Sequence, residues 1–474
     1  MNHPLRHLPA VETLRRQRPL ADFPESLAVT LAREAIAAVR AQIGQGELSL
    51  APAIAAAVTH EVARRAALVQ QPSLRRILNG SGVLLHTNAG RAPLSAGAIA
   101  AIADTARGYC NLELSLDDDG RRGSRQDHVK TLLCWLTGAE DALVVNNGAA
   151  AVLLALHALA AGKQVVVSRG ELVEIGGGFR IPEVMTAAGS GLVEVGTTNR
   201  THLRDYEKAL ARDKHQQIAA LLQVHRSNFA LVGFTKTPDL SELAALAHTH
   251  DLPVIVDVGS GALEGLNSDV RGAFDREPLV ADVLRQGADL ALFSGDKLVS
   301  GPQAGILVGK RAFVQQAAQS PMARALRVDN LTLAALEHVL RVHLLGRAAT
   351  ELPALAAVAQ SVEAIAQLAE KLAIDLRTQL PDGWHVVVEP SEAQLGGGTD
   401  PLVRLPSSSI VLHRLGRSGP QLQAGLLAAA VPVIGRVRGD HVWLDVRTLQ
   451  AGSHGADHAA LGSELLDGLR SLSA

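Results

Sequence analysis

Residues Leu292-Phe293-Ser294-Gly295-Asp296-Lys297-Leu298 place a lysine on a turn of small residues directly after an apolar run. A second apolar run, Val254-Ile255-Val256-Asp257, ends in an acid and is followed by Gly259-Ser260-Gly261. Pyridoxal 5'-phosphate requires such a pair, because a lysine amine forms a Schiff base with its aldehyde and a carboxylate keeps its pyridine nitrogen protonated. A lone lysine at a strand end is usually a solvated charge. The paired spacing and the glycine-rich surroundings favour a cofactor site.

Length and composition indicate a globular protein of several domains. The chain has 474 residues, of which 47% are hydrophobic and 19% charged, so it has room for roughly three domains with sizeable cores. A net charge of −2 gives no overall preference for nucleic acid, and an aromatic content of 3% argues against an RNA surface built on base stacking. Residues 1–78 differ, because ten arginines against six acids leave a local charge of +4. Arginines in such numbers are also common as ordinary helix-surface charges.

The sequence predicts a reducing compartment and no membrane span. Cys110 and Cys134 are too few for a disulfide framework or a zinc site, so we expect free thiols and no metal centre. The first residues lack the apolar core of a signal peptide. Residues 142–162 carry no charge, but Asn146, Asn147 and His157 interrupt them, which favours a buried strand and helix. We therefore expect a soluble cytoplasmic protein without membrane contact.

Residues 1–78 are predicted to form a small helical N-terminal domain. Ser26–Ala41 and Leu50–Val69 alternate apolar and polar positions with helical spacing. Gly44-Gln45-Gly46 separates the two stretches, and Gln70-Gln71-Pro72 follows the second.

Residues 79–330 change to apolar strand runs that alternate with helices such as Ala149–Ala161 and Leu240–His250. This alternation predicts an α/β domain with a mostly parallel sheet covered on both faces, and such sheets bind ligands beyond the carboxyl ends of their strands. The predicted strands are Ala142–Val145, Gln164–Ser168, Gly191–Val195, Ala219–Val224, Val254–Val258 and Leu290–Phe293.

Residues 331–474 are predicted to form a smaller α+β domain. It begins with two long helical stretches, Leu331–Leu345 and Ala354–Leu380, and ends in a helix at Ala456–Leu472. Gly396-Gly397-Gly398 predicts a loop. The predicted strands are Ile410–Leu412, Val431–Val437 and Val442–Val446.

A candidate phosphate site lies where Val145 passes into Asn146-Asn147-Gly148-Ala149. Small residues let the backbone approach an anion, and the free N–H groups of a helix start attract it. A simple capped helix start would have the same appearance. The predicted cofactor-binding residues are Asn146, Asn147, Gly148, Ala149, Asp257, Ser294 and Lys297.

His225-Arg226-Ser227-Asn228 follows another strand and places four polar side chains at the same predicted edge. A loop histidine is more often structural than catalytic. Its position between the phosphate turn and Asp257 nevertheless makes His225 a candidate for contact with cofactor or substrate.

Several arginines suggest a second phosphate-bearing ligand. Arg91 follows His86-Thr87-Asn88, and a guanidinium fork suits a tetrahedral oxyanion. Exposed arginines that pair with nearby acids are the plain alternative. The candidate substrate-binding residues are Arg91, Arg122, Arg125, Arg324 and Arg327.

Together these motifs resemble the bacterial L-seryl-tRNA(Sec) selenium transferases, also called selenocysteine synthases. Gly148 stands where a third asparagine is expected, and Ala89 where a larger apolar residue is expected. The similarity spans most of the chain. It is carried by residues 79–83, 86–88, 121–125, 146–147, 169–171, 176–182, 225–229, 257 and 294–297.

The resemblance implies a fold type I pyridoxal phosphate transferase that assembles as a homo-oligomer, a ring of dimers of decameric size. Its N-terminal domain would bind tRNA, and its substrates would be seryl-tRNA(Sec) and selenophosphate. Lys297 would be the Schiff-base lysine, with Asp257 and His225 as further catalytic residues. Arg91, Arg324 and Arg327 would be candidate ligands of selenophosphate.

The reaction implied is a β-elimination of water from the seryl ester, which leaves an aminoacrylyl-tRNA, followed by addition of selenium to give L-selenocysteinyl-tRNA(Sec). Loss of the hydroxyl needs a proton donor, for which Lys297 and His225 are both open. An aminoacyl ester has no free carboxylate, so the site should use its arginines for phosphate.

Two alternatives stay open on the sequence. One is a lyase of the same fold that acts on a small amino acid or amino sugar acid, with Arg436, Arg438 and Arg447 as its carboxylate clamp. The N-terminal helical domain argues against it. The other is a catalytically silent RNA-binding or scaffolding protein, against which Lys297 and Asp257 argue.

Overall fold

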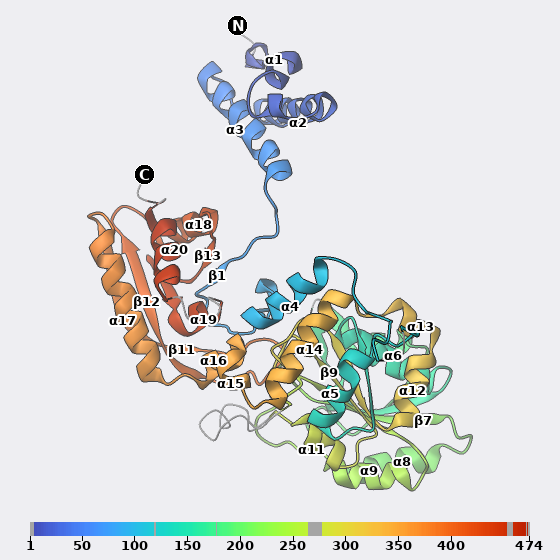
Figure 1. The fold of residues 1–474 in the computed structure, drawn as a ribbon. Coiled ribbons are helices and arrows are strands. Elements are labelled where there is room, and N and C mark those ends of the chain that lie inside the picture. Colours follow the sequence, from blue (N-terminus) through green and yellow to red (C-terminus); the bar gives the residue numbers. More distant parts are fainter. Residues whose placement is uncertain are drawn as a thin grey trace. The chain divides into compact units, whose positions relative to one another are not determined.

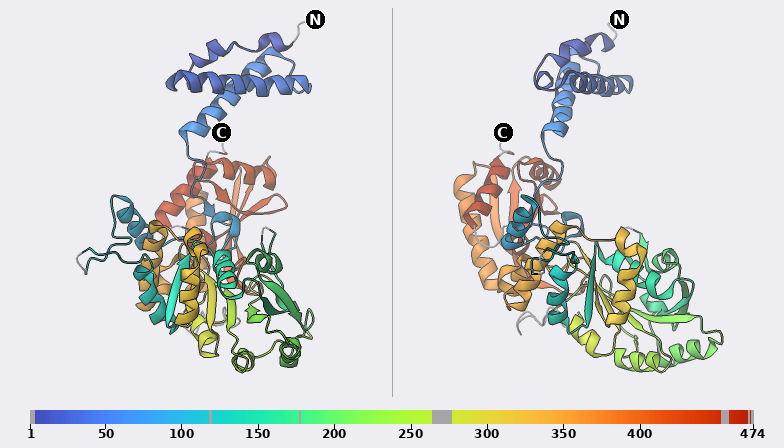
Figure 2. Two further views of the ribbon diagram at one scale, coloured as in Figure 1. Left: turned by 90° about the vertical axis from the view of Figure 1, so that its right-hand side faces the viewer. Right: turned by 45° about the vertical axis from the view of Figure 1, so that its right-hand side comes forward.

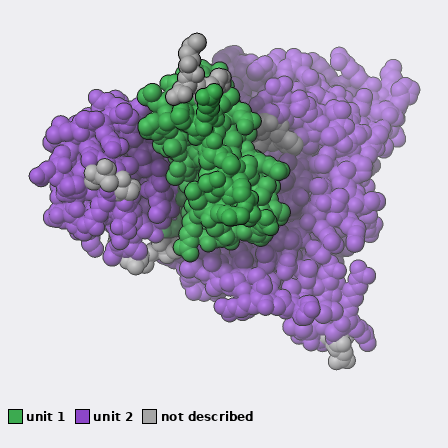
Figure 3. Space-filling model, turned by 90° about the horizontal axis from the view of Figure 1, so that it is seen from above, with its two compact units in different colours: residues 1–76 green, residues 77–474 purple. Residues whose placement is uncertain are grey.

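The computed structural model describes residues 4–117, 120–176, 178–263, 277–452, 458–470 and 472. The chain divides into two compact units, residues 1–76 and residues 77–474 (Figure 3). This division lies two residues before the predicted domain boundary at residue 78. The two units are described separately below.

The first unit is helical (Figure 1) and has a core of its own. The predicted stretch Ser26–Ala41 lies within α2, and Leu50–Val69 matches α3 except that Leu50 is its N-cap; both helices have twenty residues. Small and branched apolar side chains on their inner faces, such as Ala32 and Ile54, are fully buried. Its elements are η1 (Pro4–His7), α1 (Val11–Arg15), η2 (Leu20–Asp22), α2 (Glu25–Gly44) and α3 (Ala51–Gln70).

The second unit is built around a seven-stranded sheet in the order β2-β10-β9-β8-β7-β3-β6. All six predicted strands are present, and a seventh, β10, runs antiparallel between β2 and β9. The other pairings are parallel. The strands are β2 (Asp141–Val145), β3 (Gln164–Ser168), β6 (Gly191–Val195), β7 (Ile218–Val224), β8 (Val254–Gly259), β9 (Leu290–Ser294) and β10 (Gly305–Gly309).

Helices cover both faces of this sheet (Figures 1 and 2). Alternate residues of β8 point to opposite sides, so Val256 joins the cluster packed under α5 and α14, and Ile255 joins the cluster packed under α6 and α7. Both faces are therefore apolar, as a parallel sheet requires. The helices are α4 (Ala96–Ala106), α5 (Asp127–Thr137), α6 (Gly148–Ala160), α7 (Ile181–Ala187), α8 (Leu203–Arg212), α9 (Leu240–His248), α11 (Val280–Arg285), α12 (Arg311–Gln319), α13 (Pro321–Ala325) and α14 (Asn330–Leu344).

The rest of the second unit is a lobe with a four-stranded antiparallel sheet in the order β11-β12-β15-β14. One face of this sheet packs on α17, α18 and α20 through leucines and valines. Its elements are α15 (Ala348–Glu351), α16 (Pro353–Ala359), α17 (Val362–Gln379), β11 (Trp384–Ala393), β12 (Leu405–Arg414), α18 (Gly419–Ala428), β13 (Val433–Ile434), β14 (Arg436–Arg438), β15 (His441–Asp445), α19 (Val446–Ala451) and α20 (His458–Arg470).

Several predictions in this lobe were wrong in detail. The predicted helix Ala354–Leu380 is two helices, because Ser361 begins α17 afresh by accepting a hydrogen bond from the Ala364 N–H at 3.2 Å. The predicted strand Val431–Val437 is interrupted between β13 and β14. The predicted strand Val442–Val446 stops at Asp445, which caps α19. The predicted terminal helix begins, as described, at His458; residue 456 lies outside the described residues.

A short chain segment connects this lobe to the edge of the large sheet. β1 (Leu78–Asn79) pairs in parallel with β13, and the Leu84 and Leu85 N–H groups donate to the carbonyls of Gln394 and Leu395 at 2.9 and 2.7 Å. These contacts place residues 86–91, including η3 (Thr87–Ala89), beside the loop that follows β11. The remaining short elements are η4 (Arg169–Glu171), β4 (Glu174–Gly176) and β5 (Phe179–Arg180). Within the described residues, no helix is both long and apolar enough to cross a membrane.

Candidate active site

The carboxyl ends of neighbouring strands bring the predicted site residues together. Val224 at the end of β7 pairs with Asp257 of β8, and Asp257 pairs with Leu292 of β9. His225 follows β7 and Lys297 follows β9, so the imidazole, the carboxylate and the amine leave the sheet at one edge.

These side chains line one cavity of about 480 Å³. Eight predicted residues belong to its wall: Arg91, Asn147, Gly148, Ala149, His225, Asp257, Ser294 and Lys297. The wall is completed by Thr87, Val152, Val173, Val224, Ser227, Asn228, Gly259, Gln303, Gly397 and Gly398. The cavity has the size of a small-molecule site and holds both an amine and a carboxylate.

Lys297 and Asp257 are both buried, and burial shifts both towards neutrality. Burial raises the pKa of Asp257 to about 6, although Lys297, the Gly259 N–H and His225 act in the opposite direction. Burial and the nearby Arg91 lower the pKa of Lys297, against the attraction of Asp257, Asp296 and Glu277. Such paired perturbations in a cavity are typical of functional sites.

The start of α6 forms another part of the wall. Asn147 caps the helix, because its Oδ1 accepts a hydrogen bond from the Ala150 N–H at 2.8 Å. Gly148 lies against Ser294: a Cβ on Gly148 would come within 2.5 Å of Ser294 Oγ. The predicted turn is thus a true helix N-terminus that faces the cavity.

Arg91 enters the cavity from the segment before α4. Its Nη1 lies 3.1 and 3.2 Å from the two carboxylate oxygens of Asp296, the residue next to Lys297. The residue itself has a positive φ of 62°, which places it on the tight turn after η3. A guanidinium with further N–H groups therefore lies beside the lysine.

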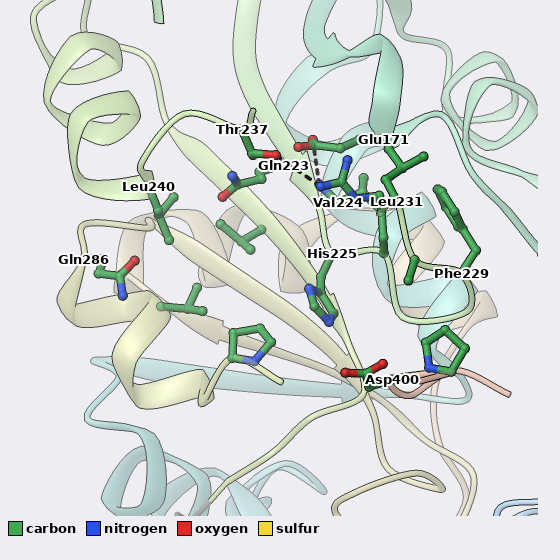
Figure 4. A pocket seen from close by; sticks show the side chains of 16 residues that line it. Glu171, Gln223, Val224, His225, Phe229, Leu231, Thr237, Leu240, Gln286 and Asp400 are labelled. Carbon is green, nitrogen blue, oxygen red and sulfur yellow. Dashed lines mark hydrogen bonds between the residues drawn. The ribbon is translucent and has the colours of Figure 1, made fainter. Parts of the chain in front are cut away.

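A second cavity of about 360 Å³ adjoins the first and shares Val224 and His225 with it (Figure 4). Glu171 Oε2 accepts a hydrogen bond from the Val224 N–H at 3.0 Å, and Arg226 Nη2 donates to Thr237 Oγ1 at 3.1 Å. Burial raises the pKa of Glu171 to about 7, with Val224 and Arg226 opposing the shift. In Figure 4 His225 lies between the Glu171 end of this cavity and Asp400.

The other predicted residues lie outside the wall of the cavity with Lys297. The N–H of Asn146 donates to the carbonyl of Leu326 at 3.0 Å, which ties β2 to the segment after α13. Arg125 donates to Glu113 at 2.6 Å and to the Val328 carbonyl at 2.8 Å. Among the described residues that line this cavity, Arg122, Arg324 and Arg327 are absent.

The three arginines of the suggested carboxylate clamp have other partners. Arg447 is buried and donates to the carbonyls of Ala357, Gln360 and Pro406 at 2.5–2.8 Å. Arg436 lies 3.4 Å from Asp445. Arg438 stacks over the Trp443 ring at 4.6 Å. These contacts attach the arginines to the small lobe itself.

Sequence reasoning missed the far wall of the cavity. Gly398 has a φ of 89°, and a Cβ there would come within 2.7 Å of Lys297 Nζ. Gly396-Gly397-Gly398 was predicted only as a loop, although a glycine run is also a signal for close backbone approach. Glu171 gave no signal beyond its place in the family pattern.

The arrangement fits pyridoxal 5'-phosphate. The buried amine of Lys297 suits the aldehyde, and the buried carboxylate of Asp257 suits the ring nitrogen. The capped N-terminus of α6 suits the phosphate. Gly398 and Gly148 keep the wall thin next to Lys297 and Ser294.

Known proteins resemble this chain in sequence. A family model described as L-seryl-tRNA selenium transferase matches residues 77–450. The L-seryl-tRNA(Sec) selenium transferase of Geobacter metallireducens is 49% identical over 415 residues, 87% of each chain. The protein of that name from Yersinia enterocolitica is 42% identical over 475 residues, 98% of each chain.

A solved structure of D-glucosaminate-6-phosphate ammonia-lyase has the same fold. It covers 86% of this chain and 99% of its own, with a TM-score of 0.54 and 19% sequence identity. The predicted α/β class is confirmed by this likeness and by the mostly parallel sheet. From the match of the family model and the identity to its members, the chain belongs to the L-seryl-tRNA selenium transferase family.

Proposed function

We propose that this chain converts L-seryl-tRNA(Sec) to L-selenocysteinyl-tRNA(Sec), with pyridoxal 5'-phosphate bound at Lys297 and selenophosphate as the selenium donor. The observation that carries the proposal is the single cavity in which Lys297, Asp257 and the N-terminus of α6 meet in a chain of this family. The matched relatives carry this activity in their names.

Each part of the cavity has a role in holding the cofactor. Lys297 would supply the amine, Asp257 would hold the ring nitrogen protonated, and the N–H groups at the start of α6 would receive the phosphate. The bound cofactor supplies an aldehyde that takes up amines and a cationic ring that draws electrons from Cα.

Lys297 is also placed to move a proton. Its lowered pKa favours the neutral amine, which can accept the Cα proton of the seryl group. The departing hydroxyl needs a proton in turn, and Lys297 and His225 are the two donors in the same wall.

We assign Arg91 to the phosphate group of selenophosphate. Its guanidinium lies in the cavity wall, and Asp296 orients it through Nη1 while other N–H groups remain. Arg122, Arg125, Arg324 and Arg327 remain proposed phosphate or tRNA ligands. In a homo-oligomer, such as the ring of dimers proposed for this chain, a neighbouring copy can bring them to a site.

The first unit is proposed to bind the tRNA. It folds around its own core and contains more arginines than acids, so it offers a basic surface in a unit that does not contain Lys297.

The test is incubation with seryl-tRNA(Sec) and selenophosphate, followed by identification of the amino acid on the tRNA. We expect selenocysteine with the parent enzyme and with Lys163→Ala, an exposed lysine before β3, and serine alone with Lys297→Ala. Full turnover by Lys297→Ala would contradict the role of the lysine. Breakdown of a free amino acid or amino sugar acid, without change to the tRNA, would favour the lyase alternative.

A further inference from the structure

His225 is held at the cavity edge by its backbone. Its N–H donates to the Asp257 carbonyl at 2.8 Å, which fixes the backbone of His225 beside Asp257 of β8. Its side chain is one-quarter exposed and belongs to the wall that contains Lys297. The position of the ring within that wall depends on what its nitrogens contact.

Glu277 lies behind this ring, three residues before α11. Its Oε2 is 3.3 Å from His225 Nε2 and also accepts a hydrogen bond from Ser260 Oγ. The Glu277 side chain is fully buried. Among the described residues its second oxygen, Oε1, has no hydrogen-bond partner.

The imidazole is a polar partner of Glu277 besides Ser260. A buried carboxylate is costly unless it is paired, and a serine hydroxyl contributes a hydrogen bond but no charge. Contact at Nε2 also selects the protonation pattern of the ring, because Nε2 must carry a hydrogen and Nδ1 becomes the nitrogen left for proton exchange.

We propose that Glu277, oriented by Ser260, is a positioning residue that holds His225 by Nε2 and makes its Nδ1 the proton donor to the leaving hydroxyl. The inference deepens the proposed function, on which it rests, by choosing His225 over Lys297 for this step.

Two protons move in this step, one to Lys297 and one from His225. The Lys297 amine accepts the Cα proton, and the electron pair of the broken Cα–H bond becomes the second Cα–Cβ bond. The Cβ–O bond breaks with its pair on oxygen, and the proton from His225 Nδ1 completes a water molecule. His225 then recovers its proton from solvent. Glu277 keeps its own charge throughout and stabilises the imidazolium.

The first test compares two leaving groups. With seryl-tRNA(Sec), Glu277→Gln should lower kcat by about 10²-fold and leave KM nearly unchanged, because a general acid contributes on that order. With β-chloroalanyl-tRNA(Sec), chloride leaves without a proton, so the loss should shrink below about tenfold. Equal losses on both substrates would overturn the proposal.

A pair of serine variants provides the control. Ser260→Ala removes the hydroxyl that orients Glu277, and Ser407→Ala removes a buried hydroxyl that donates to the buried Asp445 at 3.1 Å in the small lobe. We expect Ser260→Ala to slow the seryl substrate more than the chloroalanyl substrate, and Ser407→Ala to affect the two equally. The same leaving-group dependence in both variants would count against Glu277.

The second test needs no turnover. Solid-state spectra of apoprotein with ¹⁵N-labelled histidine, recorded at alkaline pH so that the ring is neutral and assigned by difference with His225→Asn, should show His225 with hydrogen on Nε2 in the parent and both tautomers in Glu277→Gln. An unchanged tautomer would overturn the proposal. If the apoprotein gives the expected result but the full enzyme makes no selenocysteinyl-tRNA, the proposed function fails while the His225–Glu277 pair stands.

Discussion

At the scale of single residues, the contact between Gly148 and Ser294 defines how closely α6 approaches β9. A Cβ on Gly148 would lie 2.5 Å from Ser294 Oγ but 3.7 Å from Ser294 Cβ. We expect Gly148→Ala to destabilise the protein by about 1–3 kcal/mol, the usual range for overpacking. Adding Ser294→Ala removes the Oγ and should restore most of the loss. Thermal unfolding of the four proteins of this cycle checks the prediction, and additive losses would contradict it.

Glu171 should make stability depend on pH. Because burial raises its pKa from 4.5 to about 7, the folded state holds a proton that the unfolded state has lost between those values, so stability falls as pH rises through this window. The full effect is roughly 3 kcal/mol, from 1.36 kcal/mol per pKa unit. Glu171→Gln keeps an acceptor for the Val224 N–H and should flatten the fall between pH 5 and 8.

Unfolding midpoints of the apoprotein at the two pH values measure this. Glu207→Gln, at an exposed position of α8, is the matched control and should keep the slope of the parent. The predicted direction would be contradicted if the unfolding midpoint of the parent rose between pH 5 and 8 and Glu171→Gln removed that rise.

Site residues that directly follow a predicted strand could be predicted from the sequence. Residues that reach the site from distant parts of the chain could not. Asp257, His225 and Lys297 each follow a strand, and strand ends of a parallel sheet converge. Gly398 lies beside Lys297 although it follows 101 positions later in the chain, and Glu277 contacts His225 although β8 lies between them in the sequence. No sequence spacing records such contacts.

At the scale of elements, the start of α6 tests where the cofactor phosphate lies. Asn147→Ala removes the cap and should cost about 1 kcal/mol in the apoprotein. Asn147→Asp keeps a cap of equal quality but adds a negative charge, so it should preserve the unfolding midpoint and weaken pyridoxal phosphate binding. Thermal unfolding and cofactor titration separate the two effects. Undiminished affinity in Asn147→Asp would place the phosphate elsewhere.

Strands and helices were predicted correctly where their hydrophobic pattern was clear. Five of the six strands predicted in the large sheet are mostly buried and nearly continuous in apolar residues, so their limits were evident, whereas β6 is largely exposed or half-buried and was found from Leu192, Val193 and Val195. β11 was missed because Pro390 and three acids or serines interrupt it, a composition that argues against a strand. The division between α16 and α17 was missed because Gln360-Ser361 interrupts an apolar pattern only briefly.

At the scale of the whole molecule, the two units have separate cores. The core of residues 1–76 and the clusters of residues 77–474 share no members, and the change of sequence pattern near residue 78 lies close to the division between the units. Ion pairs within the first unit offset part of its positive charge, because Arg16 pairs with Glu12 and Arg64 pairs with Glu61.

Arg33 and Arg40 are the arginines of the first unit best placed for tRNA. They lie seven residues apart at exposed positions of α2, and no ion pair involves them within the described residues. Arg33→Ala with Arg40→Ala should weaken tRNA binding and reduce the slope of log affinity against log salt by roughly 1.5, because two phosphate contacts are lost. The control, Arg16→Ala with Arg64→Ala, removes the same charge from paired positions and should change the slope less. At saturating tRNA, both double variants should turn over as fast as the parent, because neither pair of arginines lies in the unit that holds Lys297. A lowered kcat in the Arg33/Arg40 variant alone would mean that these arginines also act on the reacting end of the tRNA.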